Sequence, residues 1–407
     1  MALEPALNLW LRVFAPFAAG YYLSYLLRNV NAIIAPELTA ELGVSAADLG
    51  LLTSAYLLAF GAFQLPLGVL LDRYGPRRVE AALLMIAALG CAAFSLGENL
   101  PHLAFARGLV GLGVSACLMG SFKAFSLWFA AERQASLNAA VMAAGALGAL
   151  SATVPLGWAL PVLGWRGIFI TLSVLAVLAA AGILSTPEKP ATGRPQRFGE
   201  QIAGVAGIVM SRAFWRFAPQ AAVAIGGFMA LQGLWAVPWL MRVDGYSREA
   251  AAFHLLLSSG GMLMGFLAIA TLIVPLRRRG IEPSAILAVG MGVGIALMTL
   301  IVLGAGTSHL LWFGLGLVFS VGNLAYALLA EHFPRELSGR VTTALNLASF
   351  VGAFGLQWGV GVAVDLLGAR GMATADAYRW AFGALTAAQA AAWLWFLAGG
   401  RRTGTKA

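Results

Sequence analysis

Apolar runs long enough to span a membrane recur along the whole chain of 407 residues, and they constrain its fold more than any other feature. A run of about 20 apolar residues crosses the hydrocarbon core of a bilayer as an α-helix. We count twelve such runs, at 11–35, 47–71, 79–97, 102–127, 137–160, 166–184, 216–240, 249–275, 284–303, 308–330, 341–366 and 378–398. The expected fold class is therefore an all-α membrane protein with twelve transmembrane helices.

The composition agrees with this expectation. The chain is 60% hydrophobic and only 11% charged, whereas a soluble domain carries about 25% charged residues. The net charge of +9 does not indicate a nucleic-acid partner. Cations that flank membrane helices face anionic lipid, which explains the excess of positive charge. The two cysteines, Cys91 and Cys117, lie inside apolar runs, and we expect them to be packing residues and not a disulfide.

The distribution of Lys and Arg predicts the orientation. If both termini are cytoplasmic, inside segments hold 18 of the 26 basic residues, outside segments hold 5, and the rest lie within the runs. Basic residues concentrate in cytoplasmic loops. Together with a bias toward Ala, Gly and Arg, this pattern predicts a multi-pass protein of a bacterial cytoplasmic (inner) membrane, with both termini inside.

A polar stretch divides the chain into two halves. It begins STPEKPATGRPQR, which is typical of a linker, and continues with Phe198, Ile202, Val205 and Val209 at helical spacing, which predicts an amphipathic surface helix. The predicted domains are bundles at 1–184 and 216–398, a linker at 185–215 and a tail at 399–407. Arg73 and Arg277 occupy matching places at an offset of 204 residues, as do Phe129 and Phe333, which is typical of an internal repeat.

The most specific motif is GVLLDRYGPRR, which starts at Gly68 and lies between the second and third apolar runs. It resembles the loop between helices 2 and 3 of the major facilitator superfamily of secondary transporters, and Arg107-x-x-x-Gly111-x-Gly113 resembles the family's helix 4. The resemblance implies two pseudo-symmetric six-helix bundles, alternating access and no cofactor. It also implies a gating role for Gly68, Asp72, Arg73, Gly75, Arg77, Arg78, Glu132 and Arg133, whose alternative role is to enforce topology.

The first apolar run carries a further resemblance, to the anion:cation symporter branch of the same family. That branch has a Tyr-x-Asp-Arg-x-Asn signature, and this chain reads Tyr25-Leu-Leu27-Arg28-Asn29-Val-Asn31, with Leu27 in place of the Asp. Tyr21, Ser24, Tyr25, Arg28 and Asn31 share one helical face. Such a polar stripe either lines a cavity or packs against polar neighbours.

Three charged residues lie within apolar runs: Arg28, Arg107 and Lys123. A charge at that position costs at least ~2.5–3.5 kcal/mol, so it marks a functional candidate. We expect every Asp and Glu to lie near a helix end, Glu80 included, and Lys123 to extend to the interface. In the family, helices 1 and 4 line the central cavity, so Arg28 and Arg107 are predicted to bind an anionic substrate. The alternative is that each binds backbone carbonyls or extends to the outer interface.

Neutral polar residues complete the predicted substrate site, with packing or interfacial roles as the alternative for each of them. The predicted substrate-binding residues are Tyr25, Arg28, Asn31, Tyr56, Gln64, Arg107, Gln232, Trp235, Asn323, Tyr326, Asn346 and Gln357. For coupling we name His254, whose imidazole titrates near neutral pH, and Arg107, which the family uses in coupling. A metal site on this helix would need a second ligand, such as Met, four residues after His254. Ser258 stands there instead, so we predict no metal site.

No phosphate-binding loop, zinc-protease helix or nucleophile elbow occurs in the sequence, so an enzyme is not expected. The predicted function is a monomeric secondary transporter for a small organic anion, working by symport or exchange with a coupling ion such as H⁺. Its alternatives are a drug or metabolite efflux antiporter and a receptor that does not transport. The expected partners are the anionic substrate, the coupling ion and membrane lipid.

Overall fold

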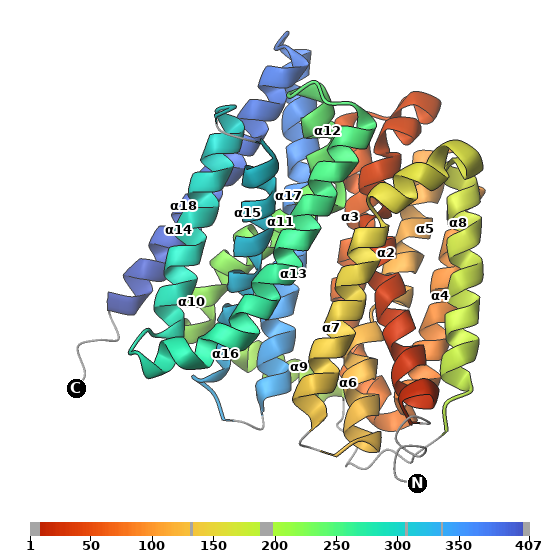
Figure 1. The fold of residues 1–407 in the computed structure, drawn as a ribbon, viewed down its shortest axis with the longest axis vertical. Coiled ribbons are helices and arrows are strands. Elements are labelled where there is room, and N and C mark those ends of the chain that lie inside the picture. Colours follow the sequence, from red (N-terminus) through yellow and green to blue (C-terminus); the bar gives the residue numbers. More distant parts are fainter. Residues whose placement is uncertain (1–8, 131–132, 188–197, 306–307, 335–336, 402–407) are drawn as a thin grey trace. The chain divides into compact units, whose positions relative to one another are not determined.

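The structure, a computed structural model, describes residues 9–130, 133–187, 198–305, 308–334 and 337–401, and these ranges are helical without strands (Figure 1). The chain forms two compact units. Unit 1 comprises Met1–Glu37 and Ala55–Ile202, and unit 2 comprises Leu38–Ser54 and Ala203–Ala407.

The described helices confirm the expected fold class. Ten helical segments are long and apolar enough to cross a membrane. Two more, α2 (Ala15–Leu42) and α7 (Gln134–Ser151), match the first and fifth predicted runs. Each of the twelve predicted runs thus corresponds to a helical segment in the described part of the chain.

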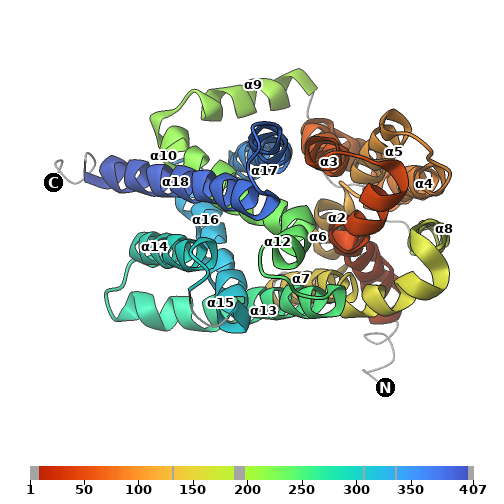
Figure 2. The same ribbon diagram turned by 90° about the horizontal axis from the view of Figure 1, so that it is seen from above.

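Unit 1 is built mainly from the first half of the chain. Its helices, besides α2 and α7, are η1 (Trp10–Phe14), α3 (Ala46–Tyr74), α4 (Pro76–Ser95), α5 (Leu100–Gly113), α6 (Cys117–Trp128) and α8 (Val154–Leu184). Helix α4 lies beside α5 and α8 (Figure 2). Glycines permit close packing there: a Cβ at Gly113 would overlap the Ala87 backbone, as expected for helices that meet through small residues in a membrane.

One predicted helix boundary in unit 1 is wrong. The fifth predicted run extends to residue 160, but α7 ends at Ser151 and α8 begins at Val154. Pro155 explains the difference, because proline is favoured in the first helical turn, where its missing N–H is not needed. Within α8 the backbone breaks at Gly164, which has φ 65°, and the long straight part of the helix follows this break.

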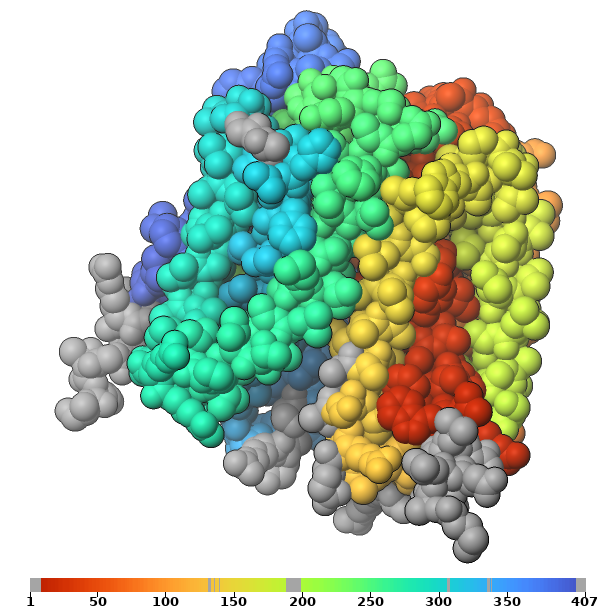
Figure 3. All heavy atoms as spheres, in the orientation of Figure 1, coloured from red at the N-terminus to blue at the C-terminus, as the bar shows by residue number. Residues whose placement is uncertain are grey.

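The outer surface of α8 is apolar, as a lipid-facing helix requires. Its exposed residues include Ile170, Val174 and Leu178, and the helix runs along the surface in yellow-green in Figure 3. Unlike a soluble protein, which exposes apolar patches of only a few hundred Å², this helix has few polar positions along its length.

Unit 2 contains the second half of the chain. Its helices are α10 (Arg212–Gln220), η3 (Ala221–Ile225), α11 (Gly226–Ala230), η4 (Leu231–Trp235), α12 (Ala236–Arg242), α13 (Arg248–Arg278), α14 (Pro283–Val302), α15 (Ser308–Phe319), η5 (Ser320–Asn323), α16 (Leu324–Ala330), α17 (Ser338–Ala369) and α18 (Thr374–Arg401). The segment from α10 to α12 is one long helix with two π-helical turns, η3 and η4. Such turns are frequent at functional sites.

Helix α3 begins in unit 2 and ends in unit 1. Its first turn is capped by Asp365 of α17, whose two carboxylate oxygens accept hydrogen bonds from the backbone N–H groups of Ala46 (3.1 Å) and Ala47 (2.7 Å). The carboxylate satisfies two N–H groups that have no partner inside the helix. The cap therefore holds the start of α3 on α17.

The predicted amphipathic helix is present as α9 (Phe198–Val209). Gln201 of α9 packs against Gly68 in α3, where a Cβ would overlap the Gln201 amide. The side chain of Gln201 is buried in this contact. The linker helix is thus tied to the glycine that opens the GVLLDRYGPRR motif.

Candidate functional site

Two guanidiniums and three aromatic rings gather in unit 1, on α2, α3 and α5. We call them the cationic cluster; it consists of Tyr25, Arg28, Tyr56, Phe60 and Arg107. Arg107 is fully buried. Its Nη1 donates to the Leu27 carbonyl at 3.0 Å, and its guanidinium lies 4.9 Å from the centre of the Tyr56 ring.

The Arg107 guanidinium keeps hydrogen-bonding capacity after these contacts. Its Nε and Nη2 groups have no partner among the described residues. An unsatisfied charged donor in a buried place is expensive, and a guanidinium binds carboxylate or phosphate oxygens in pairs. The two open N–H groups are therefore suited to an anionic ligand.

Arg28 is half-buried and lies against aromatic rings. Its guanidinium is 4.6 Å from the centre of the Tyr25 ring and 5.1 Å from that of Phe60. Tyr56 stacks on Phe60 at 6.1 Å and donates its hydroxyl to the Ser24 carbonyl at 3.2 Å. Because rings stabilise cations through their faces, this arrangement contributes to holding the guanidinium of Arg28 in place. Phe60 was not among the predicted site residues, since an apolar ring in an apolar run carries no signal in the sequence.

Two further predicted substrate residues of unit 1 are Gln64 and Asn31. Gln64 donates to the Ser115 carbonyl at 3.1 Å, at the break between α5 and α6, and so satisfies a backbone group that the break exposes. Asn31 is fully buried in α2. The structure brings together Tyr25, Arg28, Tyr56 and Arg107 from the predicted set, and Gln64 has a structural partner of its own.

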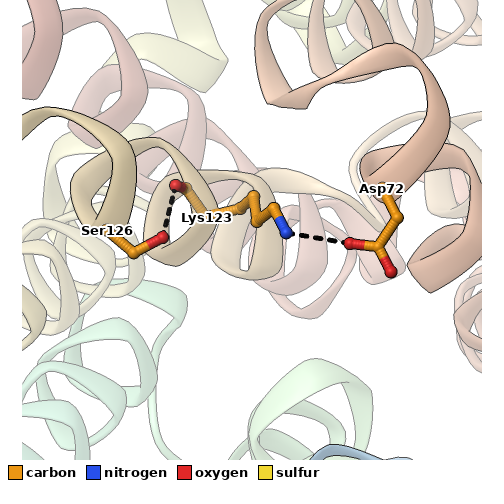
Figure 4. Close-up of polar contacts among 3 residues, drawn as sticks. All are labelled: Asp72, Lys123 and Ser126. Atoms are coloured by element: carbon orange, nitrogen blue, oxygen red, sulfur yellow. Dashed lines mark hydrogen bonds and ion pairs between the residues drawn. The ribbon is translucent and has the colours of Figure 1, made fainter. Parts of the chain in front are cut away.

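The GVLLDRYGPRR motif forms the turn between α3 and α4. Gly75 has φ 78° at the start of α4, a conformation that favours glycine. Asp72 pairs with Lys123 of α6 at 2.9 Å, as Figure 4 shows. Lys123, which is predicted to extend to the interface, thus binds a partly exposed acid 51 residues away in the sequence.

The other cations of the motif have separate surroundings. Arg77 donates from Nε to the Leu184 carbonyl at 2.9 Å, at the end of α8. The guanidinium of Arg73 lies 5.2 Å from the centre of the Tyr74 ring. Arg78 and Arg133 are exposed, and Glu132 lies outside the described residues. The motif thus connects α3, α4, α6 and α8 within unit 1.

Glu80 lies near a helix end, as expected, in the second turn of α4, but its side chain is fully buried, which was not expected. Neither carboxylate oxygen has an N–H or O–H donor among the described residues. Gly20 of α2 and Gly120 of α6 lie directly against these oxygens. Position along the chain indicated a helix end, whereas the neighbouring helices bury the side chain.

In unit 2 several of the predicted polar residues form neutral contacts, while the buried side-chain amide of Gln357 has no partner among the described residues. Gln232 donates to the Ser259 hydroxyl at 3.0 Å, and the Trp235 indole donates to the Gln357 carbonyl at 2.8 Å. The hydroxyl of Tyr326 donates to the Asn346 side-chain oxygen at 2.8 Å. Asn323 makes only a long bond, 3.4 Å, to the Ser320 carbonyl.

The predicted coupling residue His254 lies in a pair of histidines. It is fully buried, its Nδ1 is 2.7 Å from the Ala250 carbonyl, and its ring stacks on His309 with centres 4.3 Å apart. His309, the second residue of α15, was not predicted. Stacked rings do not share a metal ion, and the described residues contain no cluster of three potential metal ligands.

Comparison with known proteins identifies the family. The sequence matches the model of the Major Facilitator Superfamily over residues 17–356. It is 32% identical over 162 residues to a probable L-galactonate transporter of Escherichia coli K12, an alignment that covers 39% of this chain and 35% of that protein. It is 31% identical over 161 residues to the hexuronate transporter of the same strain, covering 40% and 37% of the two chains.

The alignments with these two relatives span less than half the length of each relative. Among solved structures, a bacterial homologue of the human lysosomal transporter Spinster, in an inward-facing and occupied conformation, matches with a TM-score of 0.77 and covers 96% of both chains at 17% identity. At that identity the similarity concerns the fold alone.

Proposed function

We propose that this chain, which belongs to the Major Facilitator Superfamily, carries a small organic anion across the membrane by alternating access. The related proteins named for galactonate and hexuronate transport support an anion of the sugar-acid class. The observation that carries the proposal is Arg107, a fully buried guanidinium with two N–H groups that have no partner among the described residues.

The cationic cluster explains why an anion is preferred to a neutral sugar. Bidentate pairing with Arg107 satisfies donors that are otherwise open. Arg28, held over Tyr25 and Phe60, adds a second positive charge on the same unit. Since electrostatic attraction is strongest where water is excluded, a carboxylate gains most from this environment and an uncharged hexose gains least.

The remaining parts of the transporter follow from the same proposal. The Asp72–Lys123 pair and Arg77 hold the motif in one arrangement, and breaking them accompanies the change of access. We also propose that the chain works as a monomer in a bacterial inner membrane, with both termini cytoplasmic.

The test is exchange of radiolabelled galacturonate in proteoliposomes that contain the purified protein. We expect unlabelled galacturonate to exchange with label and galactose not to do so. Arg28→Ala and Arg107→Ala should abolish exchange, while the control Arg379→Ala should not, because Arg379 forms an exposed ion pair with Asp376 in α18. Exchange that is unchanged in both cluster variants would overturn the anion site, and efflux of lipophilic cations or neutral drugs would instead favour the antiporter.

A further inference from the structure

Glu80 is a carboxyl group that nothing in the cationic cluster or the motif explains. It lies on α4, is 0% exposed, and has no N–H or O–H donor on either oxygen within the described ranges. Burying an ionised carboxylate without a partner costs several kcal/mol. In the arrangement seen here the group is therefore stable as the neutral acid, which must take up a proton.

The space around the carboxyl is built by two glycines on different helices. A Cβ at Gly20 of α2 would lie 2.7 Å from Oε1, and a Cβ at Gly120 of α6 would overlap Oε2. Any larger residue at either position would move the carboxyl. The side chain is thus enclosed between the backbones of α2 and α6, with Ile183 and Leu84 as further neighbours of Gly20.

The charged groups on the helices around α4 are directed to other partners. On α6, Lys123 pairs with Asp72; on α5, Arg107 binds the Leu27 carbonyl; on α2, Arg28 lies over the Tyr25 ring. On α8, Arg166 lies over the Trp165 ring, and on α4 itself Arg77 binds the Leu184 carbonyl.

The titratable group that faces Glu80 is the thiol of Cys117 on α6, which lies within reach of a weak S–H hydrogen bond to the carboxyl. A neutral thiol does not replace a cation as a partner for a carboxylate. Among the described residues of the helices around α4, the cations named above therefore do not hold Glu80 ionised in this arrangement.

We propose that Glu80 is the proton-binding site that couples anion transport to proton movement, an inference that rests on the proposed function. A hydronium ion transfers one proton to a carboxylate oxygen of Glu80. One O–H bond of hydronium breaks and leaves water, one O–H bond forms on the carboxyl, and the side chain becomes neutral. The neutral acid is then buried between α2 and α6. Release to water re-forms the carboxylate, which requires an arrangement in which water reaches the group. The proton thus binds Glu80 with a different affinity in each conformation, and its binding shifts the equilibrium between the conformations.

Proton binding at Glu80 also balances the charge of the transported anion. A monovalent anion bound at the cationic cluster and a proton on Glu80 cross together with a combined charge of zero. The transported pair therefore moves without working against the membrane potential, and the pH gradient supplies the driving force. One pH unit corresponds to about 1.4 kcal/mol, or a tenfold concentration ratio.

The experiment compares Glu80→Gln with wild type in proteoliposomes at zero membrane potential. Two assays are made on each protein: exchange of galacturonate without a pH gradient, and accumulation driven by a gradient of one unit. Wild type should exchange and should accumulate about tenfold. Glu80→Gln, which mimics the protonated acid, should keep exchange and show a concentration ratio of one.

The two assays separate the failure of this proposal from the failure of the proposed function. Absence of exchange in wild type refutes anion transport itself. Exchange in both proteins together with tenfold accumulation by Glu80→Gln refutes the role of Glu80 alone. Glu80→Asp is the conservative variant: because it retains a carboxyl, it should recover part of the accumulation, and no recovery would count against proton binding.

A spectroscopic measurement covers the case in which Glu80→Gln does not fold. Infrared difference spectra of the wild-type protein between acidic and alkaline buffer should contain the C=O stretch of a protonated, buried carboxylic acid. Gly120→Ala should shift this band, because the new methyl group displaces Oε2, and Asp72→Asn should leave it in place. A spectrum without such a band, or a band that Gly120→Ala does not alter, would overturn the proposal.

Discussion

The two units bury polar groups in different ways. Among the described residues, the fully buried carboxyl and guanidinium groups, Glu80 and Arg107, both belong to unit 1. Several predicted polar residues of unit 2 bind other neutral groups, as Gln232 binds Ser259 and Tyr326 binds Asn346. The buried Gln357 amide has no partner among the described residues, but it cannot carry a charge, whereas the open groups of Glu80 and Arg107 can.

This difference indicates where the chemistry of transport resides. A buried charge destabilises the fold unless it is paired, so groups such as Arg107 and Glu80 contribute through ligands that the protein alone does not supply. An anion serves the guanidinium and a proton serves the carboxyl. In unit 2, hydrogen bonds between neutral groups contribute shape and modest stability.

The largest effect is expected from replacing Arg107, the buried cation that distinguishes unit 1 from unit 2. Arg107→Met should lower galacturonate exchange about 10- to 150-fold, because hydrogen bonds to charged groups contribute about 1.5–3 kcal/mol. Its thermal unfolding temperature in detergent should stay the same or rise, since replacing a poorly paired buried charge by an apolar side chain is often stabilising. A transport loss that only parallels a lower unfolding temperature would make Arg107 a structural residue.

A smaller effect is expected at Asp365, a carboxylate of unit 2 that caps the start of α3. Asp365→Ala removes both acceptors for the N–H groups of Ala46 and Ala47, and loss of such a cap costs about 0.5–2 kcal/mol. Asp365→Asn keeps one acceptor and should lose roughly half as much. Thermal unfolding gives the order of the three proteins, and an equal loss for both variants would show that charge, not capping, is what matters.

The neutral pairs of unit 2 should matter less. Tyr326→Phe removes the hydrogen bond to Asn346 and should cost about 0.5–1.5 kcal/mol of stability. The preference for galacturonate over galactose should remain, because no charge is lost. Competition assays with the two sugars measure this preference, and a variant that accepts both equally would place anion selectivity in unit 2.

The smallest change in stability is expected for the half-exposed pair of unit 1. The side chains of Asp72 and Lys123 are 34% and 28% exposed, and such pairs contribute about 0–1 kcal/mol. Asp72→Asn should therefore leave thermal unfolding nearly unchanged. It should slow exchange if the rate of the change of access depends on making and breaking this ion pair. Exchanging the two residues, Asp72→Lys with Lys123→Asp, should restore part of the rate; a rate that stays low would assign the effect to Asp72 alone.

The sequence was sufficient for the fold because twelve long apolar runs leave a membrane protein few alternatives. Boundaries were less predictable: Pro155 lies in an apolar run, and only the turn at Ala152–Thr153 shows that it starts a helix. The same limit explains Glu80. Its burial depends on Gly20 and Gly120, which are 60 and 40 residues away in the sequence, and no local pattern records that they meet.

The pairing of distant side chains was also beyond the sequence. Lys123 binds Asp72 and His254 stacks on His309, and in each case the two residues come from different helices. By contrast, Arg28 and Arg107 were identified because a charge in an apolar run is costly wherever the helices pack. Their grouping with Tyr25 and Tyr56 agrees with the predicted set, while their role in substrate binding is a proposal.

The central claim is that unit 1 binds an anion through its guanidiniums. The most direct measurement is isothermal titration of the purified protein with galacturonate and with galactose, for wild type and for Arg28→Ala. We predict binding of galacturonate alone, weakened at least about tenfold in the variant, which corresponds to 1.4 kcal/mol. Equal affinity for the two sugars, or galacturonate binding that is unchanged in Arg28→Ala, would contradict the claim.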